Sequence, residues 1–239
     1  MLTKPPTCTA CPLFAEGLGF QRNVITHYQE MPETFYVPKQ TRWPKAVFIG
    51  EALGAHEAEQ GEPFVGATGQ MLRKMMQQAG IVPEEVYITN TVKCRPPGNR
   101  PPTEGEAAYC TSQYLWKELD RIKPNVIVPV GGTALKAIAP HLPGIMRSRG
   151  YVHSTKHGKA IPIVHPSFVA RGNQEFWSIT VVDLIKVRRE WETSLVKTYK
   201  ENFTISPDLE AIRQFCHNVI DKGLPVSFDI ETFGSFKDP

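Results

Sequence analysis

Residues 46–50 read AVFIG and residues 86–90 read VYITN, two short apolar runs with the length and composition of buried strands. NVIVPVG at 125–131 and IPIVH at 161–165 are two further runs of the same kind. Segments with helical spacing alternate with them, at 68–80, 103–123, 133–139 and 175–191. This alternation predicts an α/β fold, a three-layer α/β/α arrangement with a central four-stranded, mostly parallel sheet.

Two of these helices carry end signals. Thr103 followed by Glu106 is a capping box that opens a helix extending to about Lys123, where Pro124 intervenes. Gly80 ends the segment 68–80 and is expected to cap the helix at its C-terminus.

Residues able to contact a ligand follow each predicted strand. Ligands of such folds bind beyond the carboxyl ends of the strands. The four strand ends are followed by a carboxylate, a carboxamide, a glycine pair and an imidazole, in Gly50-Glu51-Ala52, Asn90, Gly131-Gly132 and His165-Pro166-Ser167. We therefore predict that these groups line one crevice, where helix starts also offer backbone N–H groups to an anion.

The composition is that of a globular protein, with 41% hydrophobic and 21% charged residues in 239. It excludes a disordered polymer, a collagen and a coiled coil. The absence of an apolar run of about 18 residues predicts no membrane partner, and the N-terminus shows no secretory signal, so we expect a cytoplasmic protein. The first 200 residues carry 24 basic and 17 acidic residues. This excess of basic residues is as consistent with a polyanionic partner such as nucleic acid as with a mildly basic domain that has no such partner.

Four of the five cysteines form two pairs, Cys8-x2-Cys11 and Cys94-x15-Cys110. Without a secretory signal a disulfide framework is not expected. A C-x-x-C pair can hold one metal centre, and two more thiolates brought in by the fold would complete a four-Cys site. Cys216 falls on a separate acidic helix and is expected to be a small core residue.

The pattern changes after about residue 195. An amphipathic helix spans 206–223, with Pro207 near its start and Gly223 at its end, and LPVSFDIET at 224–232 then indicates a new strand. We predict a first domain at 1–195, a linker and helix at 196–223, and the start of another domain at 224–239.

Three blocks, GEALGAHEAEQGEPFVGATGQML (50–72), YITNTVKCRPPGNRPP (87–102) and VHPSFVAR (164–171), together with the four cysteines, resemble family 4 uracil-DNA glycosylases. The resemblance covers about residues 5–190 in the family's motif order. It implies a uracil-DNA glycosylase-like fold, a hydrolase that excises uracil in base-excision repair of DNA, and a 4Fe–4S cluster held by Cys8, Cys11, Cys94 and Cys110.

The resemblance also implies site roles. Glu51, Asn90 and His165 would be catalytic, with Asn90 reading the base edge and His165 contacting uracil O2. Phe64 would stack on the uracil. Ala52 occupies a position where related branches carry a catalytic Asp, and Glu57 matches a second acidic position that lies near the substrate.

Uracil chemistry explains these residue types. The nucleotide must be flipped out of a duplex or taken from single-stranded DNA, and Phe64 offers it a π-face. A carboxamide at Asn90 can accept from N3–H and donate to O4, which discriminates uracil from cytosine. A donor at His165 would stabilise the leaving uracil anion, and Glu51 would stabilise the cationic sugar or orient water.

Contacts to DNA are predicted on loops near the crevice. Phosphate contacts are expected from Arg95, Arg100, Arg147, Arg149 and Arg171. Phe168, next after HPS, is placed to wedge into the base stack.

One departure from the family pattern and the choice of metal at the cysteines leave alternatives open. GEALG carries Leu53 where the family has Pro, so the second hypothesis is a catalytically weak or inactive glycosylase-like DNA-binding module of a DNA polymerase. The four cysteines could instead bind structural zinc. CRPPGNRPP lacks the histidine with which a related branch captures DNA covalently, so we expect no covalent capture.

FDIET at 228–232 resembles the first motif of DEDD-type 3′–5′ exonucleases, with Asp229 and Glu231 on one strand face. The chain thus looks like the glycosylase-like domain at the front of some phage DNA polymerases. This predicts exonuclease and polymerase domains in cis, a bacterial host cytoplasm, and no nuclease activity of residues 1–239 alone.

Overall fold

The structure is a computed structural model, and it describes residues 4–21, 44–82, 85–196 and 208–223. The chain divides into two units, residues 1–196 and residues 197–239. The strand expected at 224–232, with Asp229 and Glu231, lies outside the described residues.

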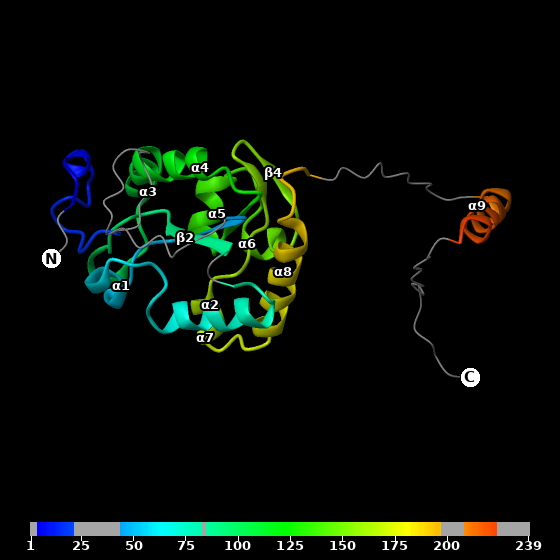
Figure 1. The fold of residues 1–239 in the computed structure, drawn as a ribbon, viewed down its shortest axis with the longest axis horizontal. Helices are drawn as coiled ribbons and strands as arrows, with labels where there is room; N and C mark the ends of the chain where they lie inside the picture. The colour runs from blue at the N-terminus through cyan, green and yellow to red at the C-terminus, as the bar shows by residue number, and fades with distance from the viewer. Residues whose placement is uncertain (1–3, 22–43, 83–84, 197–207, 224–239) are drawn as a thin grey trace, which may run out of the picture. The chain divides into compact units, whose positions relative to one another are not determined.

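The first unit is built on a five-stranded sheet with the order β2-β1-β3-β5-β4 (Figure 1). The strands are β1 (Ala46–Gly50), β2 (Val86–Asn90), β3 (Val126–Pro129), β4 (His153–Thr155) and β5 (Gly158–Ala160). β1 pairs in parallel with both β2 and β3, and its last residue Gly50 lies beside Asn90. The predicted parallel α/β sheet is confirmed, and β1 and β2 have the predicted bounds.

The fourth predicted strand differs from the structure. Pairing with β3 begins earlier, at β5, and continues past it through the N–H groups of Ile161 and Ile163, which donate to the carbonyls of Ile127 and Pro129 at 2.9 Å each. Pro162 between them faces away from β3, and its carbonyl accepts from the Gly150 N–H at 2.9 Å, so its missing N–H does not break this pairing. The predicted strand at 161–165 thus pairs with the β3 segment as far as Ile163, which bridges Val130. The sequence analysis also missed β4, a three-residue polar strand that pairs antiparallel with β5.

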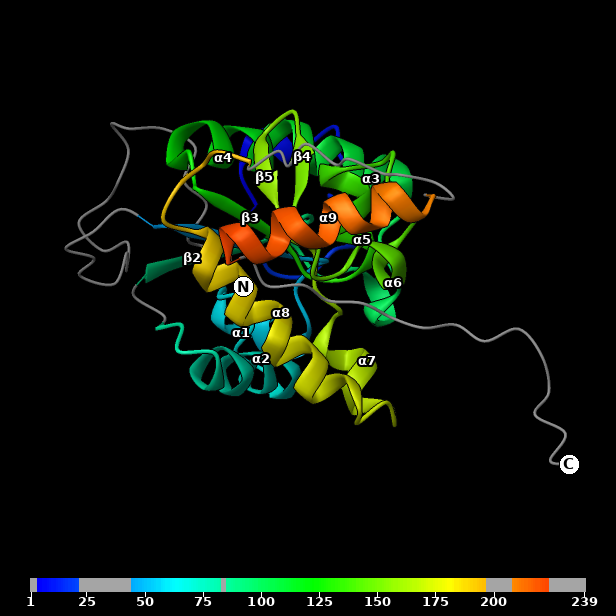
Figure 2. The same ribbon diagram turned by 90° about the vertical axis from the view of Figure 1, so that its right-hand side faces the viewer.

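Helices cover both faces of the sheet (Figures 1 and 2). They are α1 (Ala55–Gln60), α2 (Ala67–Gln78), α3 (Glu104–Cys110), α4 (Trp116–Ile122), α5 (Gly132–Ile138), α6 (Ile145–Ser148), α7 (Pro166–Ala170) and α8 (Phe176–Glu190). Alternate residues of β1 enter different cores: Phe48 packs with α2 and α8, whereas Val47 and Ile49 pack with α4 and α5. This period of two is what a strand buried on both faces requires.

The helix expected over 103–123 is interrupted. Thr103 and Glu106 form the predicted capping box, and Lys123 ends the segment in the left-handed region. A π-helical turn at Thr111–Leu115 separates α3 from α4. It begins directly after Cys110, and such turns frequently mark functional sites.

In the second unit, α9 (Leu209–Lys222) is capped by Asp208 and ends at Gly223, as the sequence indicates. The side chain of Cys216 is exposed rather than in a core, because none of the residues of α9 is buried in the described structure. Among the helices that the structure describes, none is long and apolar enough to cross a membrane.

Candidate active site at the carboxyl ends of the strands

The ends of β1 and β2 meet the aromatic ring of Phe64. A Cβ placed on Gly50 would overlap Asn90 Oδ1 and would lie 2.7 Å from two atoms of the Phe64 ring. Only glycine fits at this position, because both groups lie against the Gly50 backbone. The carboxamide and the aromatic ring predicted to contact the base are therefore neighbours.

Phe64 is held by its loop in an uncommon backbone conformation. Its φ is 56°, which costs a non-glycine residue energy and is typical of functional sites. The buried Glu57 carboxylate of α1 accepts a hydrogen bond from the Gly66 N–H at 2.9 Å and is packed against Gly54. Glu57 thus fixes the loop that carries Phe64.

His165 also lies close to Phe64, with the two ring centroids 6.1 Å apart. It is the N-cap of α7, and its Nδ1 accepts a hydrogen bond from the Ser167 N–H at 3.1 Å. A backbone N–H can only donate, so the ring proton of the neutral imidazole is on Nε2. Burial, and secondarily the charge of Arg171, lower the pKa of His165 to about 4, so the ring is neutral at pH 7.

Glu51 follows β1 and is half-buried. Its carboxylate accepts a hydrogen bond from the hydroxyl of Thr133, in the first turn of α5, and its carbonyl accepts from the Val92 N–H at 2.9 Å. The next residue, Ala52, packs against the cysteine-rich cluster rather than against Phe64 or His165. Sequence reasoning missed Thr133, which holds the Glu51 side chain.

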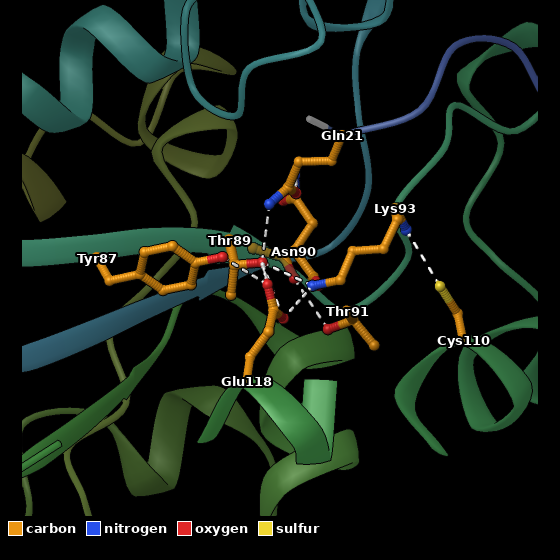
Figure 3. Close-up of polar contacts among 9 residues, drawn as sticks. Gln21, Tyr87, Thr89, Asn90, Thr91, Lys93, Cys110 and Glu118 are labelled. Atoms are coloured by element: carbon orange, nitrogen blue, oxygen red, sulfur yellow. Dashed lines mark hydrogen bonds and ion pairs between the residues drawn. The ribbon is translucent and has the colours of Figure 1, made fainter. Parts of the chain in front are cut away.

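A buried polar network lies next to Asn90 (Figure 3). Asn90 Nδ2 donates to Gln21 Oε1 at 3.3 Å, and Gln21 Nε2 donates to Thr89 Oγ1 at 2.9 Å. Behind Thr89 the ion pair of Lys93 and Glu118 is closed at 2.5 Å, with both side chains buried. Sequence reasoning missed this network, because polar residues that pair across the fold show no periodicity.

The four cysteines line one cavity within the first unit. Cys8 closes a 3-10 turn (η1, Pro6–Cys8), Cys11 follows it, Cys94 lies after β2, and Cys110 ends α3. We call these four residues the cysteine corner. A Cβ on Gly17 would lie 3.0 Å from Cys94 Sγ, so the chain passes close to this thiol.

Hydrogen bonds and burial set the protonation of these thiols. The Lys93 N–H donates to Cys110 Sγ at 3.2 Å, and the hydroxyl of Tyr114 lies 3.1 Å from Cys8 Sγ. Burial raises the pKa of Cys94 to about 11 and that of Cys110 to about 12. Within the described residues, no three Cys, His, Asp or Glu side chains are arranged to hold a single metal ion.

The arginines predicted to bind DNA fall into two groups. Arg149 is bound to Asp183 at 2.6 and 2.8 Å, and Arg100 to Glu106 at 2.6 and 2.8 Å, so both brace the fold. Arg147 and Arg171 are exposed, and Arg171 donates to Ser167 Oγ beside His165.

Arg95 and Phe168 are both partly buried and make contacts within the fold. The half-buried Arg95 contacts Asn99 at 2.6 Å. Phe168 packs edge-on against Phe176 with ring centroids 5.1 Å apart.

Comparison with known proteins places the chain. The model of the uracil DNA glycosylase superfamily matches residues 38–185. The type-4 uracil-DNA glycosylase of Thermotoga maritima is 36% identical over 184 residues, covering 76% of this chain and 88% of the relative. That of Archaeoglobus fulgidus is 42% identical over 146 residues, covering 57% of this chain and 73% of the relative.

A third relative is larger. A DNA polymerase of Bacillus phage SP01 is 32% identical over 128 residues, which cover 53% of this chain but 14% of the polymerase. The family match spans the sheet, the Phe64 loop and His165, so the chain belongs to the uracil-DNA glycosylase superfamily.

Proposed function

We propose that this protein is a hydrolase that cleaves the N-glycosidic bond of deoxyuridine in DNA and releases uracil. The observation that carries the proposal is that Asn90 and His165 both lie beside Phe64 at the carboxyl ends of the parallel sheet. The identity with type-4 enzymes over most of the chain supports the same activity.

The base is read by Phe64 and Asn90. A flipped uracil stacks on the Phe64 ring, and the adjacent carboxamide accepts from N3–H and donates to O4. Thymine shares this edge with uracil and differs by its 5-methyl group, so its exclusion depends on the space around the ring. Glu57 acts as a positioning residue, because it fixes the backbone of the Phe64 loop.

Bond cleavage leaves negative charge on the uracil and positive charge on the sugar. His165, neutral and with its proton on Nε2, donates to uracil O2 and stabilises the departing anion. Glu51, held by Thr133, stabilises the sugar cation and orients the attacking water.

The substrate is uracil-containing DNA, single- or double-stranded. Arg147 and Arg171 are exposed and would pair with phosphates, as would Arg95 on the loop after β2. Arg100 and Arg149 are already paired with carboxylates, so their part in DNA binding is to hold the loops that carry the others. Phe168 is packed against Phe176, and as a wedge it would have to turn outward.

Cys8, Cys11, Cys94 and Cys110 fit a 4Fe–4S cluster. They line one cavity and supply the four thiolates that such a cluster takes as ligands. Four thiolates are also the ligand set of a tetrahedral zinc site, so the metal content of the purified protein decides between the two. When bound, the cluster ties together segments that are distant in sequence, and no step of the hydrolysis passes through it.

The match to a small part of a phage DNA polymerase supports a further proposal: this chain is the front segment of a polymerase with a 3′–5′ exonuclease domain, encoded by a phage and active in the host cytoplasm. In that arrangement residues 1–195 form the glycosylase domain, residues 196–223 the linker and helix, and residues 224–239 begin the exonuclease. The fragment alone should not degrade DNA.

One assay tests the proposed activity. The protein is incubated with an oligonucleotide that contains one uracil and with its thymine counterpart, and abasic sites are then cleaved with alkali. We expect cleavage of the uracil strand alone. Binding of both strands without cleavage would favour the DNA-binding module instead.

A further inference from the structure

We propose that a buried relay of hydrogen bonds, from the Lys93–Glu118 ion pair through Thr89 and Gln21, sets which way the Asn90 carboxamide points. The relay thereby determines which pyrimidine the site accepts (Figure 3). The proposal rests on the base-reading role proposed for Asn90. In this view Gln21, Thr89, Lys93 and Glu118 are positioning residues that never touch the base.

The relay starts at a cation whose donors are all used. Lys93 Nζ donates to Glu118 Oε2 at 2.5 Å, to Thr89 Oγ1 at 2.6 Å and to the Asn90 carbonyl at 2.7 Å. An ammonium has three N–H groups and no acceptor. Thr89 Oγ1 must therefore accept from Lys93.

The donors and acceptors around the Thr89 hydroxyl follow from this bond to Lys93. Its hydroxyl has one proton and two lone pairs. The proton goes to Glu118, whose carboxylate can only accept and whose Oε1 lies 3.1 Å from Thr89 Oγ1. One lone pair is taken by Lys93, so the second faces a donor, which is Gln21 Nε2 at 2.9 Å.

Gln21 then has one possible orientation. With its amino group on Thr89, its Oε1 faces Asn90 and accepts from Asn90 Nδ2 at 3.3 Å. Gln21 is fully buried, and its backbone N–H donates to the Lys93 carbonyl at 2.7 Å, so the side chain starts from a fixed point.

The last member of the relay is Asn90. Within the described part of the chain, the bond to Gln21 uses one N–H and leaves Oδ1 and the second N–H for a base. Oδ1 lies over Gly50, beside the Phe64 ring. Uracil N3 carries a hydrogen and cytosine N3 a lone pair, so an outward Oδ1 accepts uracil, whereas a reversed carboxamide would favour cytosine.

Binding measurements on two matched oligonucleotides test the relay. One contains 2′-fluoroarabino-uridine and the other 2′-fluoroarabino-cytidine, whose glycosidic bonds resist cleavage, so both dissociation constants are measurable for every variant. We expect the wild type to prefer the uracil probe by at least about tenfold. Thr89→Val keeps the shape but removes the hydroxyl, and it should lower this preference at least about fivefold.

Three further variants test whether the hydrogen bonds of the relay cause this change in preference. Gln21→Met removes the amide without touching the ion pair and should act like Thr89→Val. Thr89→Ser retains the hydroxyl and should retain most of the preference. Thr180→Val is the matched control, because Thr180 is fully buried and bonds only within α8, to the Phe176 carbonyl at 2.6 Å among the described contacts; its preference should be unchanged.

The outcomes separate the relay from the site itself. If Asn90→Ala abolishes the preference while Thr89→Val and Gln21→Met both keep it, the relay is wrong and the proposed site stands. If Asn90→Ala itself keeps the preference and the excision rate, the proposed role of Asn90 fails. A variant that merely loosens the fold would weaken both probes equally and leave their ratio at the wild-type value, which also overturns the relay.

Discussion

The candidate site at the strand ends and the cysteine corner are built in different ways. The site consists of Glu51, Phe64, Asn90 and His165, and we call it the strand-end crevice. Asn90 is the last residue of β2, His165 follows the segment that pairs with β3, and Phe64 contacts the Gly50 backbone at the end of β1. The thiols of the corner come from the η1 turn and the residues just after it, from the loop that follows β2, and from the end of α3. The comparison teaches that regular backbone places the reacting groups, whereas the corner depends on what its thiols bind.

A short antiparallel pairing of two backbone segments joins the two regions. Leu18 and Arg95 exchange N–H to carbonyl hydrogen bonds of 2.9 Å each, and the next bond along this pairing ties Gln21 to Lys93. The segment that carries Cys8 and Cys11 therefore also carries Gln21, whose side chain contacts Asn90. Damage to the corner should reach the crevice through Gln21, while damage to the crevice should leave the corner intact.

The largest effect is expected from the corner. Cys94→Ala should abolish the broad visible absorption and the iron content, expected at about four per chain, and should expose residues 4–21 to proteolysis, because metal binding contributes folding energy. Cys216→Ala, on the exposed face of α9, is the matched control and should leave both unchanged. Stoichiometric zinc without iron in the wild type would contradict the cluster.

His165→Ala should slow excision and leave the metal content of the corner unchanged. We expect normal iron content and a single-turnover excision rate lowered at least about tenfold, since one donor to the leaving base is lost. His141→Ala, which changes an exposed histidine, provides the control. Excision at the wild-type rate in His165→Ala would remove this residue from the mechanism.

Gly50→Ala tests the packing of the crevice. The added methyl group would overlap Asn90 Oδ1 and the Phe64 ring, so we expect slower excision and a loss of about 1–3 kcal/mol in the free energy of unfolding. Gly105→Ala places a methyl group in open space in the first turn of α3, so it should leave the excision rate unchanged and should not lower the free energy of unfolding. Equal behaviour of the two variants, in rate and in denaturant midpoint, would argue against the close contact.

The low pKa of His165 predicts a pH dependence. In the fold this pKa is about 4, against about 6.5 in an unfolded chain. Between these values the unfolded state binds the proton, so stability falls as the pH drops from about 6.5 to 4, by on the order of 2 kcal/mol. Urea titrations at several pH values give the free energy of unfolding of wild type and of His165→Gln. Plotted against pH, the two free energies should differ in slope over this window and should run parallel above pH 7.

The smallest effects concern the arginines. Arg149→Ala should lower stability, because it leaves the buried Asp183 carboxylate without its partner, and should change DNA affinity mainly through the fold. Arg147→Ala should leave the melting temperature unchanged and weaken binding of undamaged DNA a few-fold, with a shallower salt dependence. If both variants bind and melt alike, the division of the arginines into two groups is wrong.

The sequence predicted those parts of the molecule that local patterns specify. The apolar runs located β1 and β2, and the capping box at Thr103 located the start of α3. The polar strand β4 fell outside the strand pattern, because it has no apolar face. The π-turn after Cys110 was missed, since a helical pattern does not show one extra residue per turn.

The candidate site was predictable in part for the same reason. Strand ends follow from the strand pattern, so the positions of Glu51, Asn90 and His165 could be anticipated. Gln21 and Glu118 could not, because their partners are 69 and 25 residues away along the chain. Such pairs appear only when the fold brings their elements together.

The most direct test of the central claim compares two measurements on Asn90→Ala: its iron content and its single-turnover rate of uracil release. If the crevice performs the chemistry and the corner only holds the fold, the variant should contain as much iron as the wild type and release uracil at least about tenfold more slowly. Wild-type release of uracil by an iron-replete Asn90→Ala protein would contradict it.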